Sequence, residues 1–76
     1  MSRTEKLVQK LLQFPKTMRF SEVKRILGYH GYEEVRVAGS HHIFQKAGTT
    51  LINVPTIRGR EVKVEYLKAI AADLNL

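Results

Sequence analysis

The segment EVRVAGSHHIF, residues 34–44, decides the fold because its side chains alternate in character on both sides of one turn. Residues 34–37 alternate between charged and apolar side chains, which predicts a half-buried strand. Gly39 and Ser40 are typical of a tight turn, and the alternation resumes over residues 41–46. The segment therefore predicts two antiparallel strands joined by a short connection.

A third strand is predicted directly after this pair. Residues 47–49 (AGT) read as another short turn, and residues 51–54 (LINV) are mostly apolar. Pro55 ends the run, because proline cannot donate a hydrogen bond to a neighbouring strand. Three short strands joined by short turns predict an antiparallel meander.

A helix is predicted near the start of the chain. Ser2 and Glu5 have the spacing of a capping box, in which each side chain bonds the backbone of the other residue. Pro15 ends the pattern, because proline disfavours helical geometry in the residue before it. The predicted helix covers residues 3–13, with apolar side chains at helical spacing: Leu7, Val8, Leu11 and Leu12.

Two further helices flank the meander. The first is predicted to begin with Ser21 as its N-cap and to end near Gly28 and Gly31, one of which should adopt the left-handed conformation. After the meander, residues 56–60 are predicted to form a loop, and a last helix covers about residues 63–74. The helix before the meander has one stripe of side chains at helical spacing: Val23, Ile26, Leu27 and His30.

The predicted order is two helices, three strands and one helix. A chain of 76 residues is expected to form a single domain, here residues 1–76. Helices at both ends of an antiparallel meander should pack on one face of the sheet, so we predict a two-layer α+β domain. Without the additional first helix, the order αβββα is that of the double-stranded-RNA-binding fold, although fold alone does not give function.

The composition favours a polyanionic partner. Thirteen Lys and Arg residues against seven Asp and Glu residues give a net charge of +6, and nucleic acid is the commonest partner of small basic domains. The absence of cysteine excludes disulfides, thiolate metal sites and cysteine nucleophiles. No apolar run is long enough to span a membrane and the first residues do not resemble a signal peptide, so we expect a cytoplasmic protein without a membrane partner.

Most enzyme classes are disfavoured by the motifs that are missing. The sequence has no Gly-rich phosphate loop, no HExxH and no metal-like spacing of His or Cys, so we expect no metal and no small-molecule cofactor. Glu33 and Glu34 are adjacent, so on a strand they point to opposite faces and cannot form a two-metal site together. His30 is expected to pack on its apolar stripe. Of His41 and His42, alternation allows only one to serve a given site.

Residues 35–44, followed by residues 52–55 (INVP), resemble the HicA family of bacterial toxins. The resemblance covers about residues 21–74 and implies the αβββα fold and the activity of a ribosome-independent mRNA interferase. It also implies an antitoxin, HicB, which binds the toxin and masks its catalytic histidine. In the family pattern this histidine is the first one after Gly-Ser, which is His41 in this chain. The turn residues that would contact RNA are Gly39 and Ser40.

Two features depart from the family pattern. The helix predicted over residues 3–13 is additional, and Thr56 stands where many members carry a histidine. RNA can be cut without a metal when its own 2′-hydroxyl attacks the adjacent phosphorus, assisted by a general base, a general acid and cations. The expected phosphate contacts are basic side chains of the predicted sheet and its loops: Arg36, Lys46, Arg58 and Arg60.

Three hypotheses are compatible with these features. The first is a metal-independent, histidine-dependent endoribonuclease toxin that acts on mRNA and is neutralised by a HicB-like antitoxin. The second is a non-catalytic RNA- or DNA-binding domain of the same fold, which Thr56 favours. The third is a protein-interaction module whose basic face binds an acidic partner, which is also a property of the first.

Overall fold

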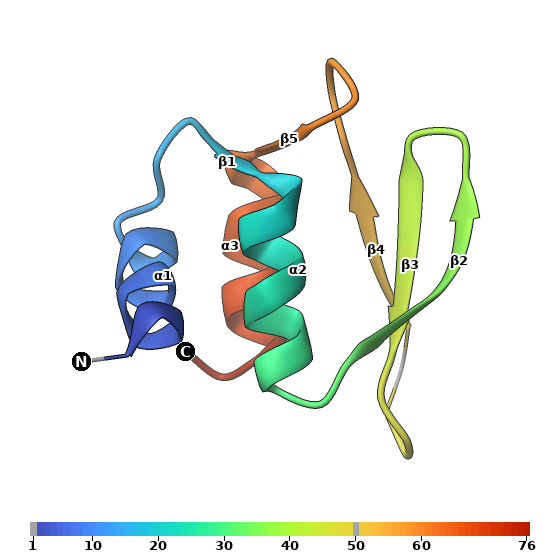
Figure 1. The fold of residues 1–76 in the computed structure, drawn as a ribbon, viewed down its shortest axis with the longest axis horizontal. Coiled ribbons are helices and arrows are strands. Elements are labelled where there is room, and N and C mark those ends of the chain that lie inside the picture. Colours follow the sequence, from blue (N-terminus) through green and yellow to red (C-terminus); the bar gives the residue numbers. More distant parts are fainter. Residues whose placement is uncertain (1, 50) are drawn as a thin grey trace.

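The fold is a three-stranded antiparallel sheet with helices on one face (Figure 1). This computed structural model describes residues 2–49 and 51–76. The elements in chain order are α1 (Arg3–Leu12), β1 (Thr17–Arg19), α2 (Phe20–Tyr29), β2 (Glu33–Ala38), β3 (His41–Gln45), β4 (Ile52–Pro55), β5 (Glu61–Lys63) and α3 (Val64–Asp73). The predicted α+β class, the three-stranded meander and the additional N-terminal helix are confirmed.

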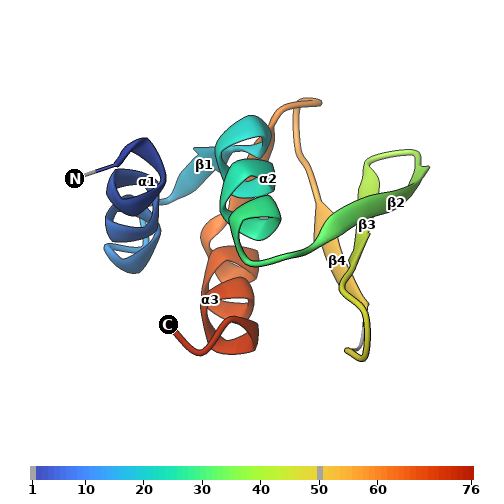
Figure 2. The ribbon, with the colours of Figure 1, turned by 60° about the horizontal axis from the view of Figure 1, so that its bottom comes forward.

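The helices form two successive layers beside the sheet. The strands β2, β3 and β4 pair in that order, and α2 and α3 cover one face of the sheet they form. The additional helix α1 packs on α2 and α3 from the side away from the sheet, as both views show (Figures 1 and 2). The other face of the three-stranded sheet is covered by none of the helices in residues 2–49 and 51–76. None of the helices that the structure describes is long and apolar enough to cross a membrane.

The hydrophobic core lies between the sheet and the helices and extends to α1. Leu11 of α1 and Met18 of β1 are as fully buried as the apolar side chains of the sheet and of α2. Residues 2–19 are therefore an integral part of the packing rather than a loose extension. The buried apolar side chains are Leu11, Met18, Val23, Ile26, Leu27, Phe44, Ile52, Val54, Val62, Leu67, Ile70 and Ala71.

The predicted helix ends are largely confirmed. Ser2 accepts a hydrogen bond from the backbone of Glu5 and the Glu5 carboxylate accepts one from the backbone of Ser2, so the capping box is present. Gly31 has a φ of 91° and follows α2, where Tyr32 N–H donates to the Leu27 carbonyl. Glycine adopts this left-handed conformation without the steric cost that a side chain adds.

The N-cap predicted for the second helix is wrong. That helix, α2, begins at Phe20 with Arg19 as its N-cap, two residues before Ser21. The reason is a tertiary contact that local propensity does not reveal. Residues 17–19 form β1, which pairs antiparallel with β5, and the Phe20 N–H donates to the Arg60 carbonyl over 2.7 Å. Neither strand of this two-stranded sheet was predicted.

The strand β2 is less buried than its alternation predicts. The register shifts between Glu34 and Arg36, so Val35 is an extra residue in a β-bulge. Val35 and Val37 are 52% and 54% exposed, whereas Glu34 is half-buried. The prediction of a half-buried strand is therefore wrong for β2, because the bulge breaks the alternation and β2 lies at the edge of the sheet.

Candidate functional site

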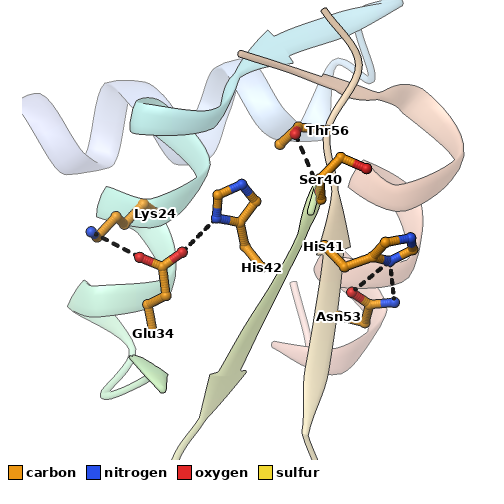
Figure 3. A network of polar contacts seen from close by, with 7 residues as sticks. All are labelled: Lys24, Glu34, Ser40, His41, His42, Asn53 and Thr56. Carbon is orange, nitrogen blue, oxygen red and sulfur yellow. Dashed lines mark hydrogen bonds and ion pairs between the residues drawn. The ribbon is translucent and has the colours of Figure 1, made fainter. Parts of the chain in front are cut away.

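The two adjacent histidines lie on opposite faces of the sheet. His42 is directly opposite Val54, whose side chain is buried under the helices. His41 is directly opposite Pro55 and is exposed on the face that carries no helix. Figure 3 shows the two rings pointing away from each other from the start of β3. This is the separation that strand alternation predicts, and it leaves one histidine on each side.

On the inner face, His42 is fixed by a network of polar and aromatic contacts. Its Nδ1 lies 2.6 Å from the Glu34 carboxylate, which also accepts from Lys24 Nζ over 3.3 Å (Figure 3). The ring stacks against Phe20 with a centroid separation of 4.0 Å. Partial burial acts to raise the pKa of Glu34, but the hydrogen bonds and charges of His42 and Lys24 together outweigh it and lower that pKa. His42 is therefore a packing residue of the inner face.

On the outer face, His41 contacts one other polar side chain. Its Nδ1 lies 3.1 Å from Nδ2 and 3.3 Å from Oδ1 of Asn53 on the neighbouring strand β4. Both residues are exposed. Figure 3 shows the amide facing Nδ1 and the other ring nitrogen on the far side of the ring from the amide. The hydrogen bonds that the ring makes to the described residues are both at Nδ1. A histidine presented in this way can take a proton from, or give one to, a molecule that binds the open face.

The turn before His41 is anchored to the end of β4. Gly39 has a φ of 61°, so the turn uses the left-handed region that glycine favours. The Ser40 carbonyl accepts the Thr56 N–H over 2.9 Å and the Thr56 hydroxyl over 3.2 Å (Figure 3). Thr56 is 6% exposed. Its side chain therefore holds the turn in place and does not reach the surface beside His41.

The structure brings Arg36 to the face of His41. Ala38 is directly opposite His41, and Arg36 is two residues before Ala38 on the same strand, so Arg36 and His41 share the outer face. Lys46 lies at the other end of β3, five residues or about 16 Å along the strand from His41. Its ammonium lies 5.9 Å from the Tyr32 ring centroid. If Lys46 contacts RNA, that contact would therefore lie far from His41.

The two remaining predicted contacts lie in the loop between β4 and β5. Arg58 and Arg60 are exposed and lie two and four residues after Thr56, which is hydrogen-bonded to the turn before His41. Arg60 also lines an open cavity of about 790 Å³ between β1, β5 and the start of α2, and His41 does not line it. The loop therefore starts next to the histidine turn, and its second arginine lies toward the helical side.

The described part of the chain contains no group of three His, Cys, Asp or Glu side chains placed to hold a metal ion. The polar side chain that contacts the exposed histidine is Asn53, for which no role was predicted from the sequence. The signal was present, because Asn53 alternates with the buried side chains of Ile52 and Val54 and must face outward. The register between β3 and β4, which brings Asn53 beside His41, cannot be inferred from the sequence pattern.

The sequence was also compared with known proteins. A family model described as "HicA toxin of bacterial toxin-antitoxin" matches residues 20–76. The match begins at the first residue of α2 and leaves α1 and β1 outside it. No curated protein and no solved structure gives a significant match.

Proposed function

Because the chain belongs to the HicA family of toxins of bacterial toxin–antitoxin systems, we propose that it is an endoribonuclease that cuts mRNA by means of His41. The observation that carries the proposal is the position of His41. It is exposed on the sheet face that α2 and α3 leave uncovered, and its Nδ1 contacts Asn53 while the other ring nitrogen makes no hydrogen bond to the described residues. His42, by contrast, is engaged by Glu34 and Phe20 on the opposite face.

The reaction that this arrangement supports is attack of the RNA on its own backbone. The outward nitrogen of His41 removes the proton from a 2′-hydroxyl, and the 2′-oxygen forms a bond to the adjacent phosphorus. The bond from phosphorus to the 5′-oxygen breaks, and that oxygen takes up a proton. The products are a 2′,3′-cyclic phosphate and a free 5′-hydroxyl. A positioned base contributes about 10²–10⁴-fold to such a step.

Cations beside the histidine stabilise the charge that develops on the phosphorane. Arg36 is the basic side chain that shares the sheet face with His41, and Arg58 lies in the loop that begins at the anchored turn. The described residues place no second histidine on this face, so water supplies the proton to the leaving oxygen. No step in this scheme requires a metal ion.

The partner that restrains the enzyme is proposed to be a HicB-like antitoxin. Because His41 is exposed on an open sheet face, a protein that covers this face blocks access of RNA without changing the toxin fold. The net charge of +6 favours an acidic covering surface. His41→Ala should keep most of its affinity for the antitoxin, because a large interface does not depend on one side chain outside a hot spot.

One observation favours a non-catalytic RNA-binding domain as a second candidate. Thr56 stands where many members of the family carry a histidine, and its hydroxyl is buried against the Ser40 carbonyl. The position therefore supplies no proton donor to the open face. A domain of this kind would bind RNA through the same basic side chains and leave it intact.

Induced expression in a bacterial host separates the two candidates. The full chain is expressed as wild type, as His41→Ala and as His41→Ala together with Arg36→Ala, and growth and message integrity are followed. The nuclease proposal predicts arrested growth and fragmented messages for the wild type alone. Intact messages in the wild type, with RNA bound by the purified protein, would establish the non-catalytic candidate.

A further inference from the structure

The contact between Asn53 and His41 has the geometry of a catalytic histidine and the residue that orients it. Asn53 reaches the histidine diagonally across the pair β3–β4, since Ile43 is directly opposite Asn53 and Pro55 is directly opposite His41. Among the described residues, the amide of Asn53 is the only side chain that hydrogen-bonds the His41 ring. Among the described side chains, Asn53 is therefore the one that can orient this exposed ring by a hydrogen bond.

We propose that Asn53 is a positioning residue that binds His41 at Nδ1 and thereby presents the outward nitrogen, Nε2, to the RNA. This inference rests on the proposed ribonuclease function, because it assigns a role within the same site. A neutral histidine that is a proton donor at one ring nitrogen is a proton acceptor at the other, so the partner at Nδ1 decides what Nε2 can do.

The carboxamide suits a base that must change its charge during the reaction. When Oδ1 of Asn53 accepts from the protonated Nδ1 of His41, Nε2 keeps its lone pair and can take the 2′-hydroxyl proton. The resulting imidazolium still donates from Nδ1 to the same oxygen, so the contact persists through the step. Both amide atoms lie within hydrogen-bond distance of Nδ1, at 3.1 and 3.3 Å, so the amide needs only a rotation about its last bond.

Two features argue against a purely structural role for Asn53. Asparagine is depleted in strands, yet Asn53 occupies the middle of β4 between the buried side chains of Ile52 and Val54. Its own side chain and that of His41 are both exposed, so the contact adds little to the hydrophobic core. Neither strand propensity nor core packing accounts for an asparagine at position 53. The hydrogen bond to His41 does account for it.

The test compares Asn53→Ala and Asn53→Asp with the wild-type chain. The matched control is Gln45→Ala, which removes an exposed amide from the same face of the sheet at the far end of β3. We expect Asn53→Ala to lower the rate of RNA cleavage about tenfold or more at unchanged RNA affinity, because a misplaced catalytic group can cost up to about 10²-fold. Gln45→Ala should cleave RNA at the wild-type rate.

Asn53→Asp tests the role of Asn53 through the pH dependence of cleavage, which would not change if Asn53 served only the fold. A carboxylate beside an imidazole favours the charged ring, so the acid limb of the pH–rate profile should shift to higher pH in this variant. The ¹⁵N chemical shifts of the His41 ring report its tautomer directly, and they should change in Asn53→Ala and stay unchanged in Gln45→Ala.

The outcomes separate this inference from the function on which it rests. If the wild type cleaves RNA and Asn53→Ala has the same rate and pH profile, the role of Asn53 is overturned and the ribonuclease stands. If the wild type leaves RNA intact, the proposed function is overturned. The ring shifts still decide the contact in that case, since identical His41 shifts in the wild type and Asn53→Ala would show that Asn53 does not hold the ring.

Discussion

The Nδ1 atom of His42 lies 2.6 Å from the Glu34 carboxylate. The contact joins β3 to the edge strand β2 on the sheet face that the helices cover. The two adjacent histidines therefore have different surroundings, because His42 is half-buried under the helices while His41 is exposed on the opposite face. Loss of each side chain should therefore have a different consequence, and stability and activity can be measured separately.

His42→Ala should destabilise the fold, whereas His41→Ala should not. Truncation of His42 removes the ring that stacks on Phe20 and leaves the half-buried Glu34 with Lys24 as its partner. The loss of one hydrogen bond to a charged group of this kind costs about 1.5–3 kcal/mol. The exposed His41 should change the free energy of unfolding by less than about 0.5 kcal/mol. Urea unfolding measures both, and equal stability of the two variants would contradict the assignment.

The lowered pKa of Glu34 predicts how stability depends on pH. A carboxyl with a lower pKa in the folded state stabilises the protein above its unfolded pKa of about 4.3, and this stability is lost as the pH falls through the folded value. The difference in unfolding free energy between the wild type and Glu34→Gln should therefore shrink between about pH 5 and about pH 3. A difference that stays constant would show that the Glu34 contacts are not maintained in solution.

Gly39→Val should damage both folding and activity. A Cβ atom at Gly39 meets nothing within 4 Å, so the cost comes from the backbone φ of 61° and not from a clash. Residues other than glycine in such conformations cost about 1–3 kcal/mol. Gly39→Asn is the matched control, because asparagine tolerates the left-handed region, and it should retain most of the stability and cleavage. Equal stability of the two variants by thermal unfolding would contradict a turn that needs this conformation.

Much of this fold was predictable because its signals are local. The alternation around Gly39 and Ser40 gave the hairpin, and the capping box of Ser2 and Glu5 gave the first helix. The strands β1 and β5 were missed because three residues carry too little pattern and their pairing joins Met18 to Val62 across most of the chain. The same pairing explains why α2 begins before the predicted N-cap, Ser21.

The site was predictable in part, for the same reason. The separation of His41 from His42 follows from strand alternation, which the sequence displays. The contact between His41 and Asn53, and the burial of Thr56 against Ser40, depend on the register between strands. Register is set by packing across the whole sheet, so no local pattern reveals these neighbours.

RNA binding should fall steeply with salt if the basic side chains contact phosphates. Arg58→Ala and Arg60→Ala should weaken binding similarly for all sequences and flatten the salt slope by up to about one unit each. Arg3→Ala is the matched control, because it removes an exposed arginine from α1, on the side of the helices away from the sheet. An unchanged affinity and slope in the double variant would exclude Arg58 and Arg60 from the interface.

The most direct test is cleavage of a defined single-stranded RNA by the purified chain in excess chelator, with DNA as the control substrate. The account predicts that the wild type cuts the RNA, leaves a 2′,3′-cyclic phosphate and spares the DNA, while the folded His41→Ala variant leaves both intact. Cleavage that stops in chelator and returns with magnesium, or a His41→Ala variant as active as the wild type, would contradict it.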